Sequence, residues 1–410
     1  MTTKSPFAMP AAFLVMIAFP TAQAFAASGA LIAAMDELRF QPPQEKGTAE
    51  LVVGKVGKAV QFRFPKDAVS AFFTSNLRGT SDWDDAEGFS FWIKGDGTDG
   101  FGGLQFIYDE DYAVRYDLCF PVKGTGWTKV VVAWRDLIPV LPGPRAKPLG
   151  KPERGGNVPS KLSALWFGKW WYWGDYPALT FAVDEIRLES KVDRGATPER
   201  PEGPPLGRVA AKLKAGKPVS VVTMGDSLTD KRHWANREVC WVDLLRDGLK
   251  AVNGSEITLV NPAIGGTQLR QNLVLLPRWL GRAPEPDLVT FFFGGNDWDA
   301  GMRGEEFTRT CEDAVDRIRR ATGGQADVLI LTANPSAARW EETAELADAC
   351  RKTALARHAG LADTEKAFQA ASLSVRDRDK LFVDDRVHLS RAGHRLVSET
   401  VLKAIQQAGK

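Results

Sequence analysis

The sequence predicts two domains of different classes, an antiparallel β-sandwich followed by a doubly wound α/β domain built on a parallel sheet. At 410 residues the chain is too long for one typical hydrophobic core. A segment rich in proline and glycine, Asp193 to Arg208, separates two regions with different hydrophobic patterns. Apolar and polar residues alternate before it, whereas short apolar runs alternate with helical patterns after it. We place the sandwich at 34–190, a linker at 191–216 and the α/β domain at 217–410.

The first 27 residues have the pattern of a secretory signal peptide, which we place at 1–27. Lys4 precedes an apolar run from Ala11 to Pro20, and small residues suited to cleavage follow in the segment Ala22 to Ala26. The run is shorter than the roughly 20 apolar residues that a membrane-spanning helix needs. We therefore expect export to the periplasm or the extracellular space, with no stable membrane insertion after cleavage.

Composition excludes some partners. The formal net charge is +2, and no basic run or basic-aromatic strip provides a field for nucleic acid or an anionic membrane. Four cysteines, Cys119, Cys240, Cys311 and Cys350, lack the paired spacing of a zinc site. Export would permit a disulfide between Cys311 and Cys350, and buried unpaired thiols fit equally well. The sequence indicates no metal or other cofactor and leaves the oligomeric state open.

Alternation predicts the strands of the first domain. They are expected at 59–64, 88–95, 104–110, 112–120, 127–134 and 179–188. The stretches "FSFWIKGDG", "GWTKVVVAWRDL" and "FAVDEIRLES" resemble those of galactose-binding-like β-sandwiches, including some carbohydrate-binding modules. This resemblance implies a jelly-roll sandwich that binds glycan or shapes the cleft.

The densest aromatic run is "LWFGKWWYWGDY", Leu165 to Tyr176. On a strand, Trp171 and Trp173 would face opposite to Trp166 and Trp170. One face would be core or interdomain contact, and the other could be a platform on which sugar rings stack. Trp171 and Trp173 are therefore candidate substrate-binding residues.

Strands and helices alternate in the second domain. Strands are expected at 219–224, 257–261, 288–293 and 328–332, and helices at 305–320, at 340–358 and after Ser390, which is a plausible N-cap. Ligands bind at the carboxyl ends of the strands in such sheets. Ser227 follows the first strand, so we ask whether the chain provides the other parts of a serine site.

A serine nucleophile needs a base, and the base needs an orienting carboxylate. His358 lies on the apolar face of a predicted helix and is expected in the core, while His394, near the start of the last helix, is expected in solvent. His233 could contact substrate but has no carboxylate at a suitable spacing. His388 follows Asp385 by three residues and forms the best base and orienter pair.

Donors for an oxyanion stand after the next strands. Gly266 can bring a backbone N–H close to a ligand because it has no side chain, Asn296 offers a side-chain amide, and the N–H of Ser227 would be the third. Each has an ordinary alternative as a turn glycine or a helix cap.

Four blocks of this region, "GDSLTD", "NPAIGG", "GGND" and "DRVHLS", resemble those of the SGNH hydrolases, also called GDSL esterases. The resemblance implies a flavodoxin-like SGNH domain with Ser227 as nucleophile and Asp385 and His388 as its partners. It also implies an oxyanion hole of Ser227, Gly266 and Asn296. The family's spacing favours Gly266 over Gly265 and Asp385 over Asp384. His233 and Trp298 are further candidates for substrate contact.

The combined pattern indicates an exported serine esterase that removes acyl groups, with acetyl as the first expectation, from a carbohydrate or polysaccharide. One alternative is a lipid or aryl-ester hydrolase of the same family, although no amphipathic lid is evident. Another is a glycan-binding protein with a vestigial hydrolase domain, which the intact Ser227, Asn296 and His388 oppose. The sugar, the acyl group and its ring position are not encoded in any recognisable pattern.

Overall fold

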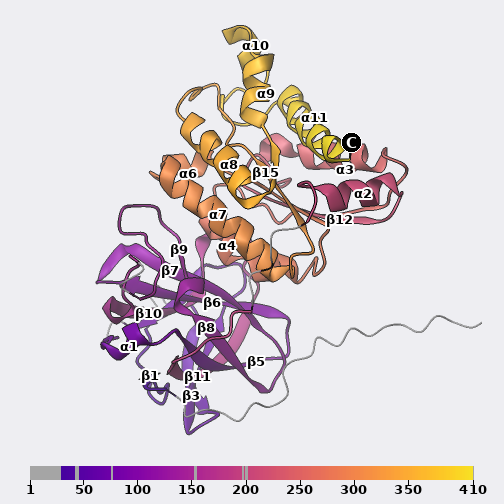
Figure 1. The fold of residues 1–410 in the computed structure, drawn as a ribbon. Coiled ribbons are helices and arrows are strands. Elements are labelled where there is room, and N and C mark those ends of the chain that lie inside the picture. Colours follow the sequence, from indigo (N-terminus) through magenta and orange to yellow (C-terminus); the bar gives the residue numbers. More distant parts are fainter. Residues whose placement is uncertain are drawn as a thin grey trace, which may run out of the picture.

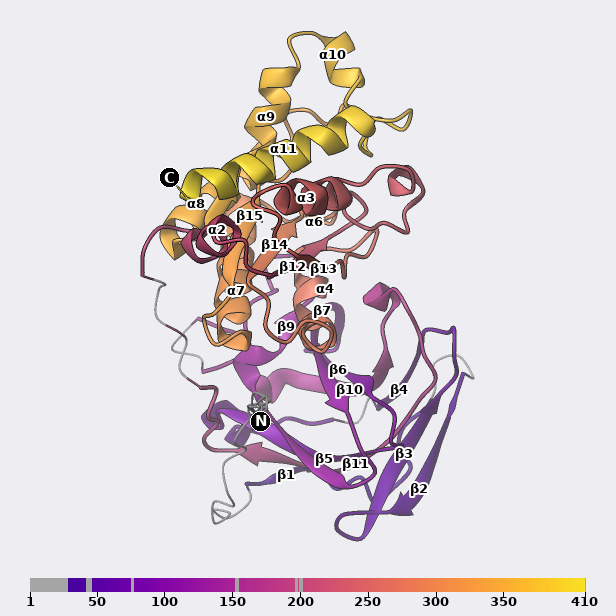
Figure 2. The same cartoon turned by 90° about the vertical axis from the view of Figure 1, so that its right-hand side faces the viewer.

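The computed structural model describes residues 29–41, 46–74, 77–151, 155–195, 198 and 202–409. The predicted signal peptide lies outside these residues. Antiparallel sheets form the N-terminal region, and a parallel sheet with helices forms the C-terminal region, as predicted. The two regions are stacked, with the sandwich below the α/β domain (Figures 1 and 2). In the described part of the chain, every helix is too short or too polar to cross a bilayer.

Two antiparallel sheets make the N-terminal domain. One has the order β2-β3-β11-β5-β8, with β1 paired to β11, and the other has the order β4-β10-β6-β7-β9. Their bounds are β1 Leu31–Ala33, β2 Thr48–Val53, β3 Lys58–Phe64, β4 Ser70–Thr74, β5 Gly88–Gly95, β6 Gly100–Tyr108, β7 Asp111–Val122, β8 Trp127–Ala133, β9 Ile138–Pro139, β10 Leu162–Lys169 and β11 Leu179–Glu189; the short helix α1 spans Asp82–Asp85. The strands predicted from alternation are confirmed as β3, β5, β6, β7, β8 and β11.

Phenylalanine fills the core between these sheets. Because side chains alternate along a strand, β3 and β10 point Phe62 and Phe167 inward, where their ring centroids lie 5.3 Å apart. Phe91 and Phe120 meet edge to face at 5.2 Å. Burying each such ring contributes roughly 1.5–3 kcal/mol. The alternate residues lie on the outer faces of the sandwich.

The second domain has a parallel sheet in the order β13-β12-β14-β15-β16. Its strands are β12 Val219–Gly225, β13 Ile257–Val260, β14 Leu288–Phe292, β15 Asp327–Leu331 and β16 Gly360–Ala362. Its helices are α2 Gly207–Lys214, α3 Trp241–Lys250, α4 Leu269–Val274, α5 Leu276–Leu280, α6 Gly295–Asp299, α7 Gly304–Ala321, α8 Ala344–Arg357, α9 Thr364–Ala371, α10 Val375–Asp379 and α11 Arg391–Ala408. The order in which strands are added reverses between β12 and β14, since β13 lies on one side of β12 and the later strands lie on the other. Ligands bind at such a switch point.

Helices cover both faces of this sheet. Helices α2, α3, α9 and α11 pack with Val221 on one face, and α4, α5, α7 and α8 pack with Val222 on the other. Helix α11 begins after Ser390, whose hydroxyl accepts a hydrogen bond from the Gly393 N–H at 3.3 Å, as predicted for an N-cap.

Several boundaries and side chains differ from prediction. The predicted linker contains α2, whose Val209 and Leu213 are buried in the α/β core, and its proline-rich neighbours concealed this short amphipathic pattern. Strand β1 extends the sandwich before residue 34. His394 is buried rather than solvated, with Nδ1 accepting from the Trp241 N–H. His358 is a half-buried C-cap residue rather than a core residue, and its Nε2 lies 2.6 Å from the Gly203 carbonyl oxygen.

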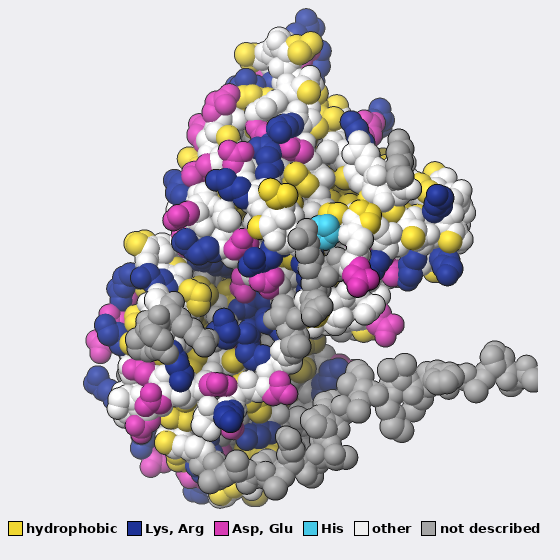
Figure 3. Space-filling model, in the orientation of Figure 1, with side chains coloured by type: hydrophobic (Ala, Val, Ile, Leu, Met, Phe, Trp, Pro, Cys, Tyr) yellow, Lys and Arg dark blue, Asp and Glu magenta, His cyan; other side chains and the backbone are white. Residues whose placement is uncertain are grey.

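The two domains share one continuous hydrophobic cluster, in which Cys119 and Trp173 of the sandwich are buried together with Leu273 and Trp279 of α4 and α5. Polar contacts cross the same boundary, because Arg317 donates to the carbonyl oxygens of Arg135 and Asp136 at 3.0 Å each. Acidic and basic side chains are interspersed over both domains on the face seen in Figure 3. The second domain thus packs against the outer face of the β4-β10-β6-β7-β9 sheet.

Candidate active site

Strand β12 delivers Ser227 to the carboxyl edge of the sheet. A tight turn follows the strand, in which the N–H groups of Thr229 and Asp230 donate to the Asp226 carbonyl oxygen at 3.0 and 2.9 Å. The Leu228 N–H donates to the Asp226 carboxylate at 3.0 Å. A Cβ at Gly225 would lie 2.3 Å from Thr229 Oγ1, so the turn closes only around glycine. The half-buried Ser227 is held at the switch point of the sheet.

The loop before α11 brings a histidine and a carboxylate to this serine. Ser227 Oγ lies 3.0 Å from His388 Nε2, and His388 Nδ1 lies 2.6 Å from Asp385 Oδ2. The other Asp385 oxygen accepts the N–H groups of Val387 and His388, both at 2.9 Å. Partial burial alone would raise the pKa of Asp385, but these hydrogen bonds hold it below its ordinary value. An ionised carboxylate can therefore orient the ring whose other nitrogen faces the serine.

The turn after β13 contains the predicted Gly266 and lies against the nucleophile loop. The Thr267 N–H donates to the Ile264 carbonyl oxygen, and Gly266, at the third position of this turn, has φ +77°. A type II turn requires a positive φ there, which favours glycine. The Gly265 N–H is already bonded to Asp230 Oδ2 at 3.0 Å. A Cβ on Gly265 would lie 3.7 Å from Ser227 Cβ, so the whole turn lies against the nucleophile loop.

Asn296, in the first turn of α6, joins this arrangement. Its Nδ2 donates to the Thr267 carbonyl oxygen at 3.1 Å and makes a longer 3.4 Å contact with Asp226 Oδ2. The structure thus gathers Ser227, Gly266 and Asn296 from three strand ends, where the sequence placed them.

Two buried carboxyl groups beneath the site were not predicted. Burial raises the pKa of both Asp226 and Asp297 to about 7, and for Asp226 the neighbouring Asp297 charge adds to the effect. Asp297 Oδ1 accepts the Leu269 N–H at 3.1 Å, which ties α4 to α6. Both residues stand inside the blocks "GDSLTD" and "GGND", which was the available signal for them.

The segment after the nucleophile turn supports His388. The His233 ring stacks on the His388 ring at a centroid distance of 4.1 Å. Burial and the nearby His388 lower the pKa of His233. Asn236, which carried no signal in the sequence, donates to the carbonyl oxygens of Ser227 and Asp230 at 2.6 and 2.8 Å. His233 thus contacts the candidate base itself, a role beyond the predicted contact with substrate.

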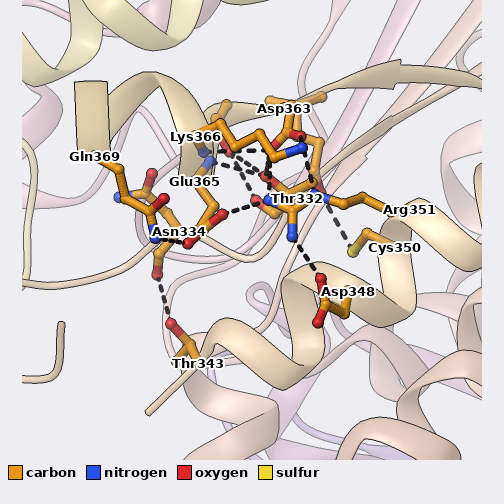
Figure 4. A network of polar contacts seen from close by, with 12 residues as sticks. Thr332, Asn334, Thr343, Asp348, Cys350, Arg351, Asp363, Glu365, Lys366 and Gln369 are labelled. Atoms are coloured by element: carbon orange, nitrogen blue, oxygen red, sulfur yellow. Dashed lines mark hydrogen bonds and ion pairs between the residues drawn. The ribbon is translucent and has the colours of Figure 1, made fainter. Parts of the chain in front are cut away.

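A cavity of about 180 Å³ opens beside Ser227. Its lining includes Phe293, Asn334, Pro335, Arg339 and Val387. Figure 4 shows the polar network behind its Asn334 wall, at the end of β15. In that network the Thr343 hydroxyl donates to the Asn334 carbonyl oxygen at 3.4 Å, and farther along Arg351 pairs with Asp363 and Glu365. The network fixes the strand end that forms this wall.

The three candidate tryptophans have different environments. Strand β10 ends at Lys169 and a 3₁₀ turn spans Trp171–Trp173, so the predicted strand alternation fails after that point. Trp171 is 50% exposed, whereas Trp173 is buried, with the Arg278 guanidinium 4.9 Å from its ring centroid. Trp298 is half-buried between Arg303 and Arg339. The lining of the cavity beside Ser227 includes none of the three, among the residues that the structure describes.

All four cysteines are buried free thiols, so the structure has no disulfide between Cys311 and Cys350. Among the described residues, no group of three or more His, Cys, Asp or Glu side chains is placed to hold a metal ion.

Comparison with known families agrees with this geometry. Residues 223–396 match the model of the GDSL-like Lipase/Acylhydrolase family. The matched segment runs from within β12 to within α11 and includes Ser227, Gly266, Asn296, Asp385 and His388. No curated protein matches the chain.

Solved structures resemble part of this chain at low identity. A lipase/acylhydrolase from Enterococcus faecalis is 22% identical over 46% of this chain and 96% of its own, with a TM-score of 0.39. An acetyl xylan esterase from Geobacillus stearothermophilus is 21% identical over 46% of this chain and 96% of its own, with a TM-score of 0.38. A two-domain esterase active on acetylated mannans is 21% identical over 50% of this chain and 53% of its own, with a TM-score of 0.41.

Proposed function

We propose that this protein is an exported serine esterase that removes acyl groups, acetyl above all, from a carbohydrate. The observation that carries the proposal is a pair of hydrogen bonds through the His388 ring, with Nε2 3.0 Å from Ser227 Oγ and Nδ1 2.6 Å from Asp385 Oδ2. The family match of residues 223–396 supports ester hydrolysis. Export rests on the predicted signal peptide.

The first chemical step forms an acyl-enzyme. His388 Nε2 takes the proton of Ser227 Oγ as that oxygen attacks the ester carbonyl carbon, and Asp385 stabilises the resulting imidazolium. The tetrahedral intermediate collapses, and the sugar hydroxyl leaves with the proton from His388. Water then attacks the acyl-serine by the same route and releases the acid.

The negative oxygen of the intermediate needs donors that are already in place. The backbone N–H groups of Ser227 and Gly266 and the side-chain amide of Asn296 fill this role. The Asn296 amide has two hydrogens, and the Thr267 carbonyl oxygen takes only one of them. The second makes only a long contact with Asp226, at 3.4 Å, and is the one left for the substrate oxygen.

The size of the cavity favours a short acyl group. At about 180 Å³ it is comparable to a cavity of about 150 Å³ that accepts benzene. An acetyl group fits, whereas a long fatty acyl chain would have to extend into solvent. The small cavity therefore supports acetyl esters over lipids as substrates, and an aryl acetate remains the second candidate.

The test is acetate release by the full chain from acetylated xylan and acetylated mannan, with p-nitrophenyl acetate as a general ester. Ser227→Ala should abolish all three activities. Ser336→Ala removes another serine of the same cavity and should retain them. Undiminished turnover by Ser227→Ala would sink the proposal. Hydrolysis of p-nitrophenyl acetate without acetate release from any acetylated polysaccharide would favour the aryl-ester alternative.

A further inference from the structure

A second cavity, of about 200 Å³, lies on the outer face of the β4-β10-β6-β7-β9 sheet and reaches Gln271 of α4. Its lining includes the indole rings of Trp166, Trp170 and Trp171. The mechanism proposed above uses none of these side chains. The cavity is distinct from the one beside Ser227, because the two share no lining residue.

Strand register builds the floor of this cavity. Trp166 on β10 pairs with Gln105 on β6, which pairs in turn with Asp117 on β7, so the three side chains form one row across the sheet. The adjacent row contains Gly168 and Gly103. A Cβ on Gly103 would lie 2.7 Å from Trp170 Nε1, so the missing side chain makes room for that indole.

The carboxylate at the bottom of the cavity is fully engaged. Asp117 is buried, and its two oxygens accept from the Tyr172 hydroxyl at 2.5 Å and from the Gln105 amide at 2.6 Å. Burial raises the pKa of Asp117 to about 6. This trio is therefore scaffold, and the groups around it are the ones available to a ligand.

Those groups are four unmatched donors. Trp166 Nε1, Trp170 Nε1, Arg115 Nε and Ser70 Oγ are buried and have no hydrogen-bond partner among the described residues. Trp170 and Ser70 are each only 6% exposed. These atoms are closed to solvent in this structure, so a ligand would reach them through small rotations of the side chains, and its oxygen acceptors would then satisfy donors that are otherwise left unpaired.

The chemistry of the ligand follows from these two features together. It must present several oxygen acceptors at its edge and an apolar face to indole rings, one of which, Trp171, is half exposed. A lipid tail would leave the donors unpaired, whereas a pyranose ring meets both demands. We propose that this cavity binds one sugar unit of the polysaccharide substrate. The inference rests on the proposed function only in that the ester substrate is a carbohydrate.

The cavity is tied to the candidate active site by two short segments. Gly174, three residues after Trp171, packs against Ile264 of the glycine turn, where an added Cβ would lie 3.0 Å from its side chain. Gln271, which lines the cavity, follows Gly266 by five residues. These two segments connect the wall of the cavity to the glycine turn of the candidate active site.

Binding should be measured by calorimetry with full-length Ser227→Ala protein, which holds substrate without turnover. The probes are the neutral oligosaccharides xylohexaose and mannohexaose and the acidic trigalacturonate. We expect at least one to bind, with about tenfold or greater loss of affinity on adding Trp166→Ala or Trp171→Ala. Trp171 is exposed, so its variant should fold even where Trp166→Ala does not. The matched control is Trp92→Ala, a half-buried tryptophan on β5 of the opposite sheet, and it should leave affinity unchanged.

Each outcome is decisive. Failure of all three probes to bind, or binding that neither cavity variant weakens, would overturn the inference. Preference for trigalacturonate that Arg115→Met removes would identify a sugar carboxylate on that guanidinium and support it. With Ser227 intact, the control Trp92→Ala should hydrolyse p-nitrophenyl acetate at the wild-type rate. An inert wild type that still binds sugar through Trp171 would refute the esterase and leave the cavity standing, whereas an active wild type that binds no sugar would do the reverse.

Discussion

Replacing Asn296 by alanine removes one of the three proposed oxyanion donors. Its Nδ2 donates one hydrogen to the Thr267 carbonyl oxygen at 3.1 Å, and the other makes only a 3.4 Å contact with Asp226. That second hydrogen is free to bind the oxyanion in the transition state. One such donor contributes about 2.7–4 kcal/mol. We therefore expect kcat for p-nitrophenyl acetate to fall about 10²- to 10³-fold, with KM nearly unchanged because the oxyanion forms only after attack.

The loss should be catalytic and not structural. The lost bond to Thr267 costs the fold about 1 kcal/mol, so Tm should drop by only a few degrees. Asn157→Ala is the matched control, because this half-buried amide in the sandwich donates to Tyr116 and to the Arg145 carbonyl oxygen. It should lose comparable stability and keep its kcat. An Asn296→Ala enzyme within about threefold of the wild-type kcat would refute the assigned donor.

Three further predictions concern the acid groups and the domain contact. Because hydrogen bonds hold the pKa of Asp385 below its ordinary value, this carboxylate should stay ionised at mildly acidic pH and keep orienting His388. Asp385→Asn should therefore lower kcat at least about 100-fold, and a kcat within about threefold of the wild-type value would contradict this. Burial raises the pKa of Asp297 from its ordinary 3.8 to about 7, so between about pH 4 and 7 the folded chain retains a proton that the unfolded chain has lost, and stability falls as pH rises. Asp297→Asn should therefore raise the free energy of unfolding by at most about 4 kcal/mol at pH 8 and by much less at pH 4, as followed by Tm at each pH. Equal gains at both pH values would contradict it. Gly174→Ala should cost about 1–2 kcal/mol of stability because of its φ of +74°, and it should also lower kcat by displacing the glycine turn. The control Gly124→Ala has φ +69° and no described atom within 4 Å of an added Cβ, so it should lower stability only. Equal kcat values in the two variants would contradict the proposed effect of Gly174 on the glycine turn.

The strands that sequence reasoning found and missed differ in their surroundings. Strand β5 turns Phe89, Phe91 and Ile93 into the sandwich core and its alternate residues to the outer face, and its predicted bounds are those observed. Strand β10 carries Phe167 toward the sandwich core and Trp166 toward the second domain, so it lacks the alternation that exposes one face to water. Strand β2 is mostly exposed, with no continuous apolar face. Alternation identifies strands that bury one face and expose the other to water, and it fails for strands whose second face is covered by another domain.

The candidate site also has a part that the sequence predicts and a part that it does not. Ser227, Gly266 and Asn296 follow strand ends. Asp385 and His388 lie just before a predicted helix start, so the meeting of all five residues could be expected from the order of the elements. The stacking of His233 on His388 and the anchoring of the nucleophile loop by Asn236 depend on side-chain packing within an irregular loop. The second cavity depends on a 3₁₀ turn that ends β10, which no periodic pattern announces.

The central claim is that Ser227 is an activated nucleophile. The most direct test treats the full chain with a fluorophosphonate and locates the adduct by peptide mass spectrometry. We predict stoichiometric labelling of Ser227, no labelling of Ser227→Ala, and normal labelling of Ser336→Ala. An unlabelled wild-type protein that is folded, or an adduct on a different residue, would contradict the account.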